Sequence, residues 1–208
     1  MRRADEKEAI AQRIEQRSTM PAMKLDSASV SPQELEYRKI LVAGEFLPQW
    51  TIYLDNRPHN GVAGFYVVMP MRIAESDRHV LVVRGWAPRD PADRFRVPAV
   101  ENSDGAVEIE GVARQRTGQL LQLGDPPPLQ PGSIVLNVDI EAFAKASGLT
   151  LLPIVIEQTS DTGDRLVRDW PQPSAGIEKH LGYAFQWYGL AATALIFYLV
   201  TGFRRASK

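Results

Sequence analysis

From Leu181 to Phe203 the chain contains no formally charged residue, although charges are spread along the rest of its length. A helix over this stretch would reach about 35 Å, enough to cross a hydrocarbon layer of about 30 Å. Aromatic residues lie near both of its ends, where their rings would meet the headgroup layers. Buried helices of soluble proteins seldom run this long without a charge. The sequence therefore predicts a transmembrane helix over residues 180–203.

A basic tail follows this helix, because residues 204–208 contain Arg204, Arg205 and Lys208. Cationic clusters just past a span tend to stay on the cytoplasmic side. We therefore expect a protein of the inner (plasma) membrane, with a cytoplasmic C-terminus and the bulk of the chain outside the cytoplasm. Residues 171–179 would link that extracytoplasmic part to the span.

The opening residues, 1–20, are typical of a charged helix and contain neither the apolar core nor the cleavage site of a signal peptide. A large domain is exported only when a segment ahead of it starts translocation. We therefore hypothesise that the natural product begins earlier, with a first membrane helix that ends just before Arg2. An in-frame apolar run upstream of the Met1 codon would support this hypothesis.

Small and polar residues recur within the predicted span at a 4-3-4 spacing, which stacks them along one helix face. They are Gly182, Gln186, Gly189 and Thr193. Small residues let a second helix approach closely, and a glutamine in lipid needs a hydrogen-bond partner. This stripe is either a contact with another membrane helix or a composition that membrane helices tolerate.

Composition limits the chemistry that the chain can perform. Lys and Arg number 24 against 25 Asp and Glu, so no overall field favours nucleic acid as a partner. The absence of cysteine excludes disulfides and thiolate metal sites. No Walker loop, dinucleotide fingerprint, GxSxG elbow or HExxH motif occurs. We therefore expect that the protein is not an enzyme and has no metal site. The enzymatic alternative is a membrane-tethered hydrolase that uses Glu45, Asp55 or Asp77 as acid or base.

Residues 21–170 show a different pattern, of short runs rich in β-branched and aromatic residues between turn residues. Such runs predict antiparallel strands. The expected strands lie near 39–47, 50–56, 63–73, 78–87, 104–115, 132–138, 152–158 and 164–168. Asn60-Gly61 marks a chain reversal, because these residues readily adopt positive φ. The prediction is a mainly β domain, barrel-like or sandwich-like, with short helices.

Two short helices are expected within this domain. Ser31 and Glu34 have the spacing of a capping box, with a proline at the first helical position. A second helix should begin after Asp139 as the N-cap and stop at Gly148. The proline-rich stretch 124–132 cannot form a continuous hydrogen-bond ladder, so it should be a stiff exposed loop.

Three histidines occur, and no two of them have the i, i+3 or i, i+4 spacing that preassembles a metal site. His59 is expected at a turn and His79 at the start of a strand. His180 would sit at the outer membrane surface, where a neutral imidazole beside aromatic rings could ligate a haem iron. An ordinary interfacial histidine is the alternative, and spacing alone favours it.

Four stretches together resemble one family, the Surfeit locus protein 1 family, known in yeast as Shy1. They are DNRPHNGVAGFYVVMP (55–70), VLVVRGWAPRD (80–90), AKASGLTLLPIVIEQ (144–158) and HLGYAFQWYGLAATALIFY (180–198). The resemblance covers most of the chain in the same order. It implies a two-helix membrane protein that assists assembly of cytochrome c oxidase; the first of these helices is missing from this sequence.

The resemblance also implies a function and site residues. It implies support for delivery of haem a to oxidase subunit I, without catalytic turnover, and a haem a synthase is a further candidate partner. His180 occupies the place of a histidine proposed in this family to ligate haem a. The family motif positions in this chain are Asn56, Arg57, Gly61, Gly64, Phe65, Arg84, Gly85 and Trp86.

The residue types suggest physical roles for these positions. Gly61 and Gly64 suit a turn or a close approach of the backbone, and Gly85 within a strand suggests a bulge or a close contact. Arg57 and Arg84 could bind haem propionates, or they could pair with Asp55 or Asp90, and we favour the structural pairing. Trp86 could pack in the core or lie near the membrane surface.

Two hypotheses of function follow. In the first, the β domain and the membrane helix together hold haem a transiently, or hold the oxidase subunit while haem enters. In the second, the protein is a scaffold that binds oxidase subunit I through the stripe of small residues in the span and carries no haem. Replacement of His180 by alanine separates the two, since only the first requires this side chain.

Overall fold

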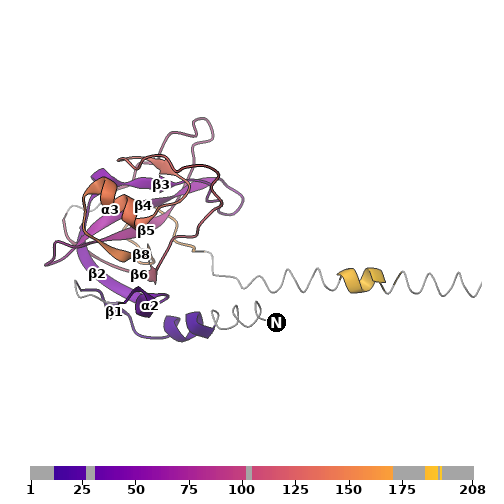
Figure 1. Cartoon of the computed structure of the whole chain (residues 1–208), viewed down its shortest axis with the longest axis horizontal. Helices are drawn as coiled ribbons and strands as arrows, with labels where there is room; N and C mark the ends of the chain where they lie inside the picture. Colours follow the sequence, from indigo (N-terminus) through magenta and orange to yellow (C-terminus); the bar gives the residue numbers. More distant parts are fainter. Residues whose placement is uncertain (1–11, 27–30, 102–104, 171–185, 192, 194–208) are drawn as a thin grey trace, which may run out of the picture. The chain divides into compact units, whose positions relative to one another are not determined.

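The computed structural model describes residues 12–26, 31–101, 105–170, 186–191 and 193. Residues 13–170 form one compact unit, and the described helical residues near the C-terminus belong to a second. Figure 1 shows the strands of the first unit curving around a common interior. The elements that position the candidate site all belong to this first unit.

The strands of this unit form one sheet with the spatial order β1-β2-β6-β8-β5-β4-β3-β7. They are β1 (Met23–Lys24), β2 (Lys39–Phe46), β3 (Ile52–Leu54), β4 (Gly64–Ile73), β5 (His79–Pro88), β6 (Val107–Arg114), β7 (Ile134–Val135) and β8 (Leu151–Gln158). Because β2 pairs with β6 and also with β4, the strands β2, β6, β8, β5 and β4 close into a ring. The prediction of a mainly β domain is confirmed, with a barrel-like core.

The sheet is not wholly antiparallel, which corrects the prediction. β8 runs parallel to β5, and the short pairs β1–β2 and β3–β7 are also parallel. Parallel neighbours need a long crossover connection, and residues 89–150 supply one between β5 and β8. The apolar pattern of a strand shows which residues are buried, but it does not show the direction of the neighbouring strand.

Residues 164–168, predicted as a strand, form only an isolated bridge. Val167 exchanges two backbone hydrogen bonds with Trp86, of 2.7 and 2.9 Å. The N–H of Leu166 donates to the Asp164 carboxylate at 3.2 Å, and Arg165 has a φ of 62°. A side chain that binds a nearby backbone N–H competes with ladder formation. The strand prediction is therefore wrong here.

The short helices agree only in part with the prediction. In α3 (Ile140–Ser147), the Asp139 side chain accepts from the N–H of Ala142 at 2.9 Å, and Gly148 ends the helix at a φ of 72°. The helix α2 (Pro32–Leu35) begins where expected, but the Ser31 hydroxyl donates to Gln33 Oε1 and forms no capping box.

One further segment departs from the prediction, and the described part of the predicted N-terminal helix agrees with it. In the predicted strand 50–56, the 3₁₀ helix η1 (Pro48–Trp50) shortens β3 to three residues. Proline at the first position of η1 favours this turn, because its fixed φ suits a helical start. Near the N-terminus, residues 12–18 are helical.

Alternate residues of β5 pack on opposite faces of the sheet, as expected for a strand buried on both sides. Val80 and Val82 join an apolar cluster with residues of β2, β4, β6 and β8. Leu81 and Val83 join a second cluster, in which Phe143 of α3 also packs. The helix α3 therefore covers the second face, and β5 lies between two apolar layers.

The predicted span 180–203 lies largely outside the described residues. Its residues 186–191 and 193 are helical, and the Thr193 hydroxyl donates to the Gly189 carbonyl at 2.8 Å. Within the part of the chain that is described, no helix has the length and apolarity that a membrane crossing requires. His180 and Gly182 are outside the described residues, so the span stays a prediction.

Candidate functional site

The family motif residues gather at one end of the β4–β5 hairpin, where β4 begins and β5 ends. Gly64, the first residue of β4, pairs with Pro88, the last residue of β5. The segments 55–63, 89–101 and 161–168 meet this end, which we call the motif end. The turn that joins β4 to β5, residues 74–78, lies at the opposite end of the same ladder.

Trp86 connects the loop before β4 to the end of β5. Its side chain is only 7% exposed, and its indole Nε1 donates a hydrogen bond of 2.6 Å to the main-chain carbonyl of Arg57. The His59 ring lies against the indole, with 5.1 Å between ring centroids. Of the two placements open at the sequence level, the structure places Trp86 inside the domain.

The indole ring explains why residue 64 is glycine. A Cβ built on Gly64 would lie 2.4 Å from two atoms of the Trp86 ring, closer than real Cβ contacts allow. Gly61 has a different role, because it has open space around it and a φ of 79°. With Asn60 at a φ of 48°, it forms the predicted reversal. Asn56 also adopts positive φ, at 58°, just before the motif arginine.

Arg57 contacts several segments of the chain, and only 6% of its surface is exposed. Its guanidinium donates to the carbonyl of Leu136 at 3.0 Å and lies 5.6 Å from the centre of the Tyr66 ring. Its backbone N–H donates to the Gly64 carbonyl at 3.1 Å. Burial lowers the pKa of Arg57 from its ordinary value. These contacts hold the loop before β4 against the end of β7.

Arg84 extends into the interior and is 1% exposed. Its Nη2 lies 2.7 Å from Asp164 Oδ2, and its guanidinium lies 4.3 Å from the centre of the Phe46 ring. Arg168 binds the same carboxylate at 2.5 and 2.7 Å. The buried partner is therefore Asp164, and neither Asp55 nor Asp90, the two acids that the sequence suggested, fills this role.

Those two acids form ion pairs at the surface of the motif end. Asp55 lies 3.7 Å from Arg89 and 4.0 Å from Arg94, and Asp90 lies 3.4 Å from Arg96. Sequence reasoning missed the pairing of Arg84 with Asp164, although one signal was present. Asp164 begins the predicted strand 164–168, and an aspartate that is buried in a strand needs a cationic partner.

Gly85 is needed for close packing at a bulge, as its position within a strand suggested. The ladder shifts register so that Val67 faces Gly85 while Val68 faces Val83, which leaves Arg84 as the extra residue. A Cβ on Gly85 would lie 2.6 Å from the Cβ of Leu166. The missing side chain lets segment 161–168 lie directly on β5.

Phe65, the remaining motif position, is fully buried beside Gly64. Its ring meets the Tyr53 ring edge to face, at 6.1 Å between centroids. Aromatic pairs in this arrangement add to the free energy of area burial. The motif positions in the domain thus mostly anchor loops and fill the interior.

The Asp164 carboxylate remains charged although it is buried. Burial by itself would raise the pKa of Asp164, but hydrogen bonds from Arg168 and the Leu166 N–H, with the charges of Arg168 and Arg84, outweigh it and lower the pKa below its ordinary value. A charged buried carboxylate is stable only with such partners. The network therefore ties segment 161–168 to β5.

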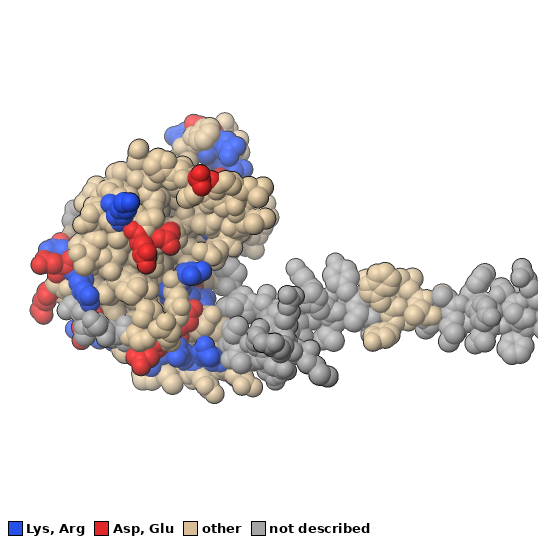
Figure 2. All heavy atoms as spheres, viewed as in Figure 1, with Lys and Arg blue, Asp and Glu red and all other residues tan. Residues whose placement is uncertain are grey.

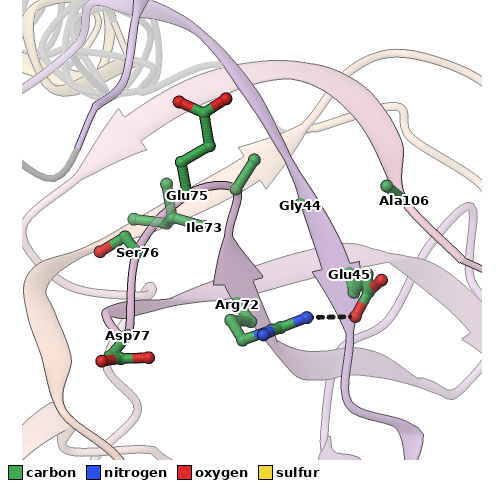
Figure 3. A pocket seen from close by; sticks show the side chains of 9 residues that line it. Gly44, Glu45, Arg72, Ile73, Glu75, Ser76, Asp77 and Ala106 are labelled. Atoms are coloured by element: carbon green, nitrogen blue, oxygen red, sulfur yellow. Dashed lines mark hydrogen bonds and ion pairs between the residues drawn. The ribbon is translucent and has the colours of Figure 1, made fainter.

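A pocket of about 450 Å³ lies at the opposite end, beside the turn between β4 and β5. Figure 3 shows Glu45 paired with Arg72 there, at 2.7 Å, while Asp77 projects separately. Asp55 lies at the motif end, so the three carboxylates considered for a hydrolase are not brought together. Among the described residues, no group of three or more histidine and acidic side chains could hold a metal ion.

Comparison with known proteins gives a consistent result. The SURF1 family model matches residues 1–192. A SURF1-like protein of Rickettsia bellii is 29% identical over 208 residues, which cover 96% of this chain and 82% of that protein. One from Rickettsia felis is 27% identical, covering 95% and 86%, and one from Monosiga brevicollis is 24% identical, covering 93% and 77%. Because the family match spans nearly the whole chain, this protein belongs to the SURF1 family.

Proposed function

We propose that this protein is a membrane-anchored assembly factor for a haem-copper terminal oxidase, and that it supports delivery of haem a to subunit I. The observation that carries the proposal is membership of the SURF1 family, which is linked to oxidase assembly, over residues 1–192. The uncharged stretch from Leu181 to Phe203 supports the membrane anchor. In this role the β domain is a rigid body outside the cytoplasm.

The two motif arginines, Arg57 and Arg84, do not fit haem propionates. Arg84 is 1% exposed and bound to Asp164, and Arg57 is 6% exposed and bound to the Leu136 carbonyl. Neither guanidinium is available at the surface for a carboxylate ligand. In our proposal, haem a is therefore held through His180 at the start of the membrane segment, and the domain contributes shape and stability.

The experiment uses the full-length reading frame, expressed in cells that make haem a and purified in detergent. We expect an absorption spectrum of haem a, and its loss in a His180→Ala variant. His59→Ala is the matched control, because His59 belongs to the domain and lies against Trp86. Undiminished haem a in the His180→Ala protein would refute ligation by this residue.

A scaffold that binds oxidase subunit I without haem is the second candidate function. One observation supports it: the Thr193 hydroxyl donates to the Gly189 carbonyl, so these two residues lie one turn apart on the same helix face, as the predicted stripe requires. Gly189→Leu should then abolish co-purification of subunit I. Ala191→Leu adds one carbon atom fewer on another helix face and should leave co-purification intact. Equal effects of the two changes would refute the stripe as the contact.

A further inference from the structure

A second pocket, of about 610 Å³, lies between α3 and the proline-rich loop that precedes β7. Pockets that bind small molecules usually measure about 300–1,000 Å³. The loop contributes the prolines 126–128 and Leu129 to its walls, and α3 contributes Ala142 and Ala146, which lie one turn apart. Most of the surface that these residues offer is aliphatic.

The pocket opens onto the apolar interior of the domain. Val135 and Val138 line it, are buried, and belong to the cluster in which Phe143 packs. No aromatic side chain lines the pocket within the described residues, so a flat ring system would find no partner for stacking. An aliphatic chain, by contrast, would extend the core.

Hydrogen bonds hold the loop in place beside the pocket. The side chain of Asn137 accepts from the N–H of Leu120 at 2.8 Å and donates to the carbonyl of the same residue at 2.9 Å. Its amide also lies 3.4 Å from Gln122 Oε1. Asn137 and Gln122 both line the pocket. The pocket is therefore formed before any ligand enters, which reduces the entropic cost of binding.

Most polar groups of the lining are already used or absent. Proline has no N–H to donate, the Asn137 amide binds Leu120, and the Asp139 carboxylate accepts from the N–H of Ala142 at 2.9 Å. Two lining side chains have no partner in the part of the chain that is described, the Gln119 amide and the Lys145 ammonium. Both can donate hydrogen bonds to a carboxylate.

The charges of the pocket are separated along α3. Asp139 is the N-cap and Lys145 belongs to the last turn, about 9 Å away along the helix axis. The helix dipole and the N–H of Ala142 stabilise the negative charge of Asp139. Figure 2 shows a broad area without charged side chains on the visible face of the domain, and α3 lies on this side in Figure 1. Lys145 therefore offers an unpaired charge beside an aliphatic surface.

We propose that this pocket binds a fatty acid, with its aliphatic chain between the prolines and α3 and its carboxylate on Lys145. A single lysine balances a single negative charge, and Asp139 would repel the second charge of a phosphate. The inference goes beyond the proposed function, because it needs neither haem a nor an oxidase subunit.

Photochemical labelling tests the proposal. The probe is dodecanoic acid with a photoreactive diazirine on its chain. The purified full chain is exchanged into lipid nanodiscs, because detergent would compete for an aliphatic pocket. After irradiation, peptide mass spectrometry should locate the label within residues 119–146. Unlabelled dodecanoate should displace it at a concentration several-fold lower than dodecylamine, which has the same chain but a positive charge.

Two variants test the two halves of the ligand. Lys145→Glu should reverse the order of the two competitors, and Lys39→Glu, at an exposed lysine of β2, should leave it unchanged. Ala142→Phe should lower the labelling several-fold, because the new ring fills the pocket. Ala92→Phe makes the same change at an exposed alanine outside the pocket. All four positions are exposed, so the urea midpoints should stay near that of the parent.

Label outside residues 119–146, or label that unlabelled dodecanoate fails to displace, would overturn the proposal. Equal displacement by dodecanoate and dodecylamine would show that Lys145 does not select a carboxylate. Equal labelling of the Ala142→Phe and Ala92→Phe proteins would exclude the pocket. These outcomes are independent of the haem a spectrum, so failure of this inference and failure of the proposed function are distinguishable.

Discussion

The indole Nε1 of Trp86 donates a 2.6 Å hydrogen bond to the main-chain carbonyl of Arg57, a residue 29 positions earlier in the chain. The bond joins the end of β5 to the loop that precedes β4. Because Arg57 in turn donates to the Leu136 carbonyl, three segments depend on one buried contact point. The motif end is therefore a small cooperative unit, in which loss of one residue should loosen several loops.

Trp86→Phe should destabilise the domain by about 1–3 kcal/mol, because the Arg57 carbonyl would lose its buried hydrogen-bond donor. Urea unfolding of the purified chain, followed by circular dichroism, measures this free energy. Trp187→Phe is the control, since Trp187 is exposed and belongs to the other unit of the chain. A Trp86→Phe protein as stable as the parent would show that the hydrogen bond contributes nothing.

Gly64→Ala should cost about 1–3 kcal/mol through overpacking against the Trp86 ring. Gly118→Ala adds the same methyl group where no atom lies within 4 Å of the new Cβ. The two variants should therefore differ clearly in their urea midpoints, with Gly118→Ala near the parent. Equal midpoints would contradict the close approach at residue 64.

The contact between Gly85 and Leu166 can be tested as a pair. Gly85→Ala alone should destabilise the domain, because the new Cβ would lie 2.6 Å from the Leu166 Cβ. Leu166→Ala leaves that Cβ in place but removes the bulk that prevents segment 161–168 from shifting. In the double variant the two costs should not add, and a coupling of about 0.5–3 kcal/mol is expected. Simple additivity would indicate that the two residues do not interact.

Asp164→Asn should be among the most damaging polar changes, at about 3–5 kcal/mol, because Arg84 and Arg168 would share no buried carboxylate. Glu45→Gln breaks the Arg72–Glu45 pair, whose side chains are about half exposed, and should cost no more than about 1 kcal/mol. Unfolding free energies of the two variants at neutral pH measure the contrast. Similar small losses would mean that the buried network contributes little to stability.

Stability should fall on acidification through His79, which is buried at the start of β5. Burial lowers the pKa of His79 below its ordinary value; it outweighs a hydrogen bond with the Thr150 backbone and the charge of Asp77, which raise the pKa, and the charge of Arg72 adds to the lowering. The unfolded chain therefore binds the proton first, at about pH 6.5. Stability is full above that pH and is lost as the pH falls through the lower pKa of the folded state.

Unfolding free energies of the parent and of His79→Asn, measured from neutral pH down to about pH 5, check this effect. The variant should show a shallower decline over that range, because the residue that takes up the proton is absent. Identical slopes would exclude His79 as the source of the pH dependence.

Local sequence determined much of the fold and some of the site. Asp139 and Gly148 defined α3 because a carboxylate cap and a residue at positive φ act within a few positions of their helix. Gly64 and Gly85 are candidates for close approach for a similar reason, beside a turn at Gly64 and a bulge at Gly85, because a missing side chain within a β-rich stretch lets something pack against the backbone. Residues 181–203 predicted a membrane helix from length and apolarity alone.

Only the tertiary structure decided which partners those residues meet. Arg84 and Asp164 are 80 residues apart, and their pairing depends on β8 entering parallel to β5 and on segment 161–168 folding back over the bulge. The periodicity of side chains along a strand shows which of them are buried. It does not show which distant residue packs against each buried side chain. The choice among several arginines and aspartates of equal charge is made by packing, which brings Arg84 and Arg168 to the buried carboxylate of Asp164.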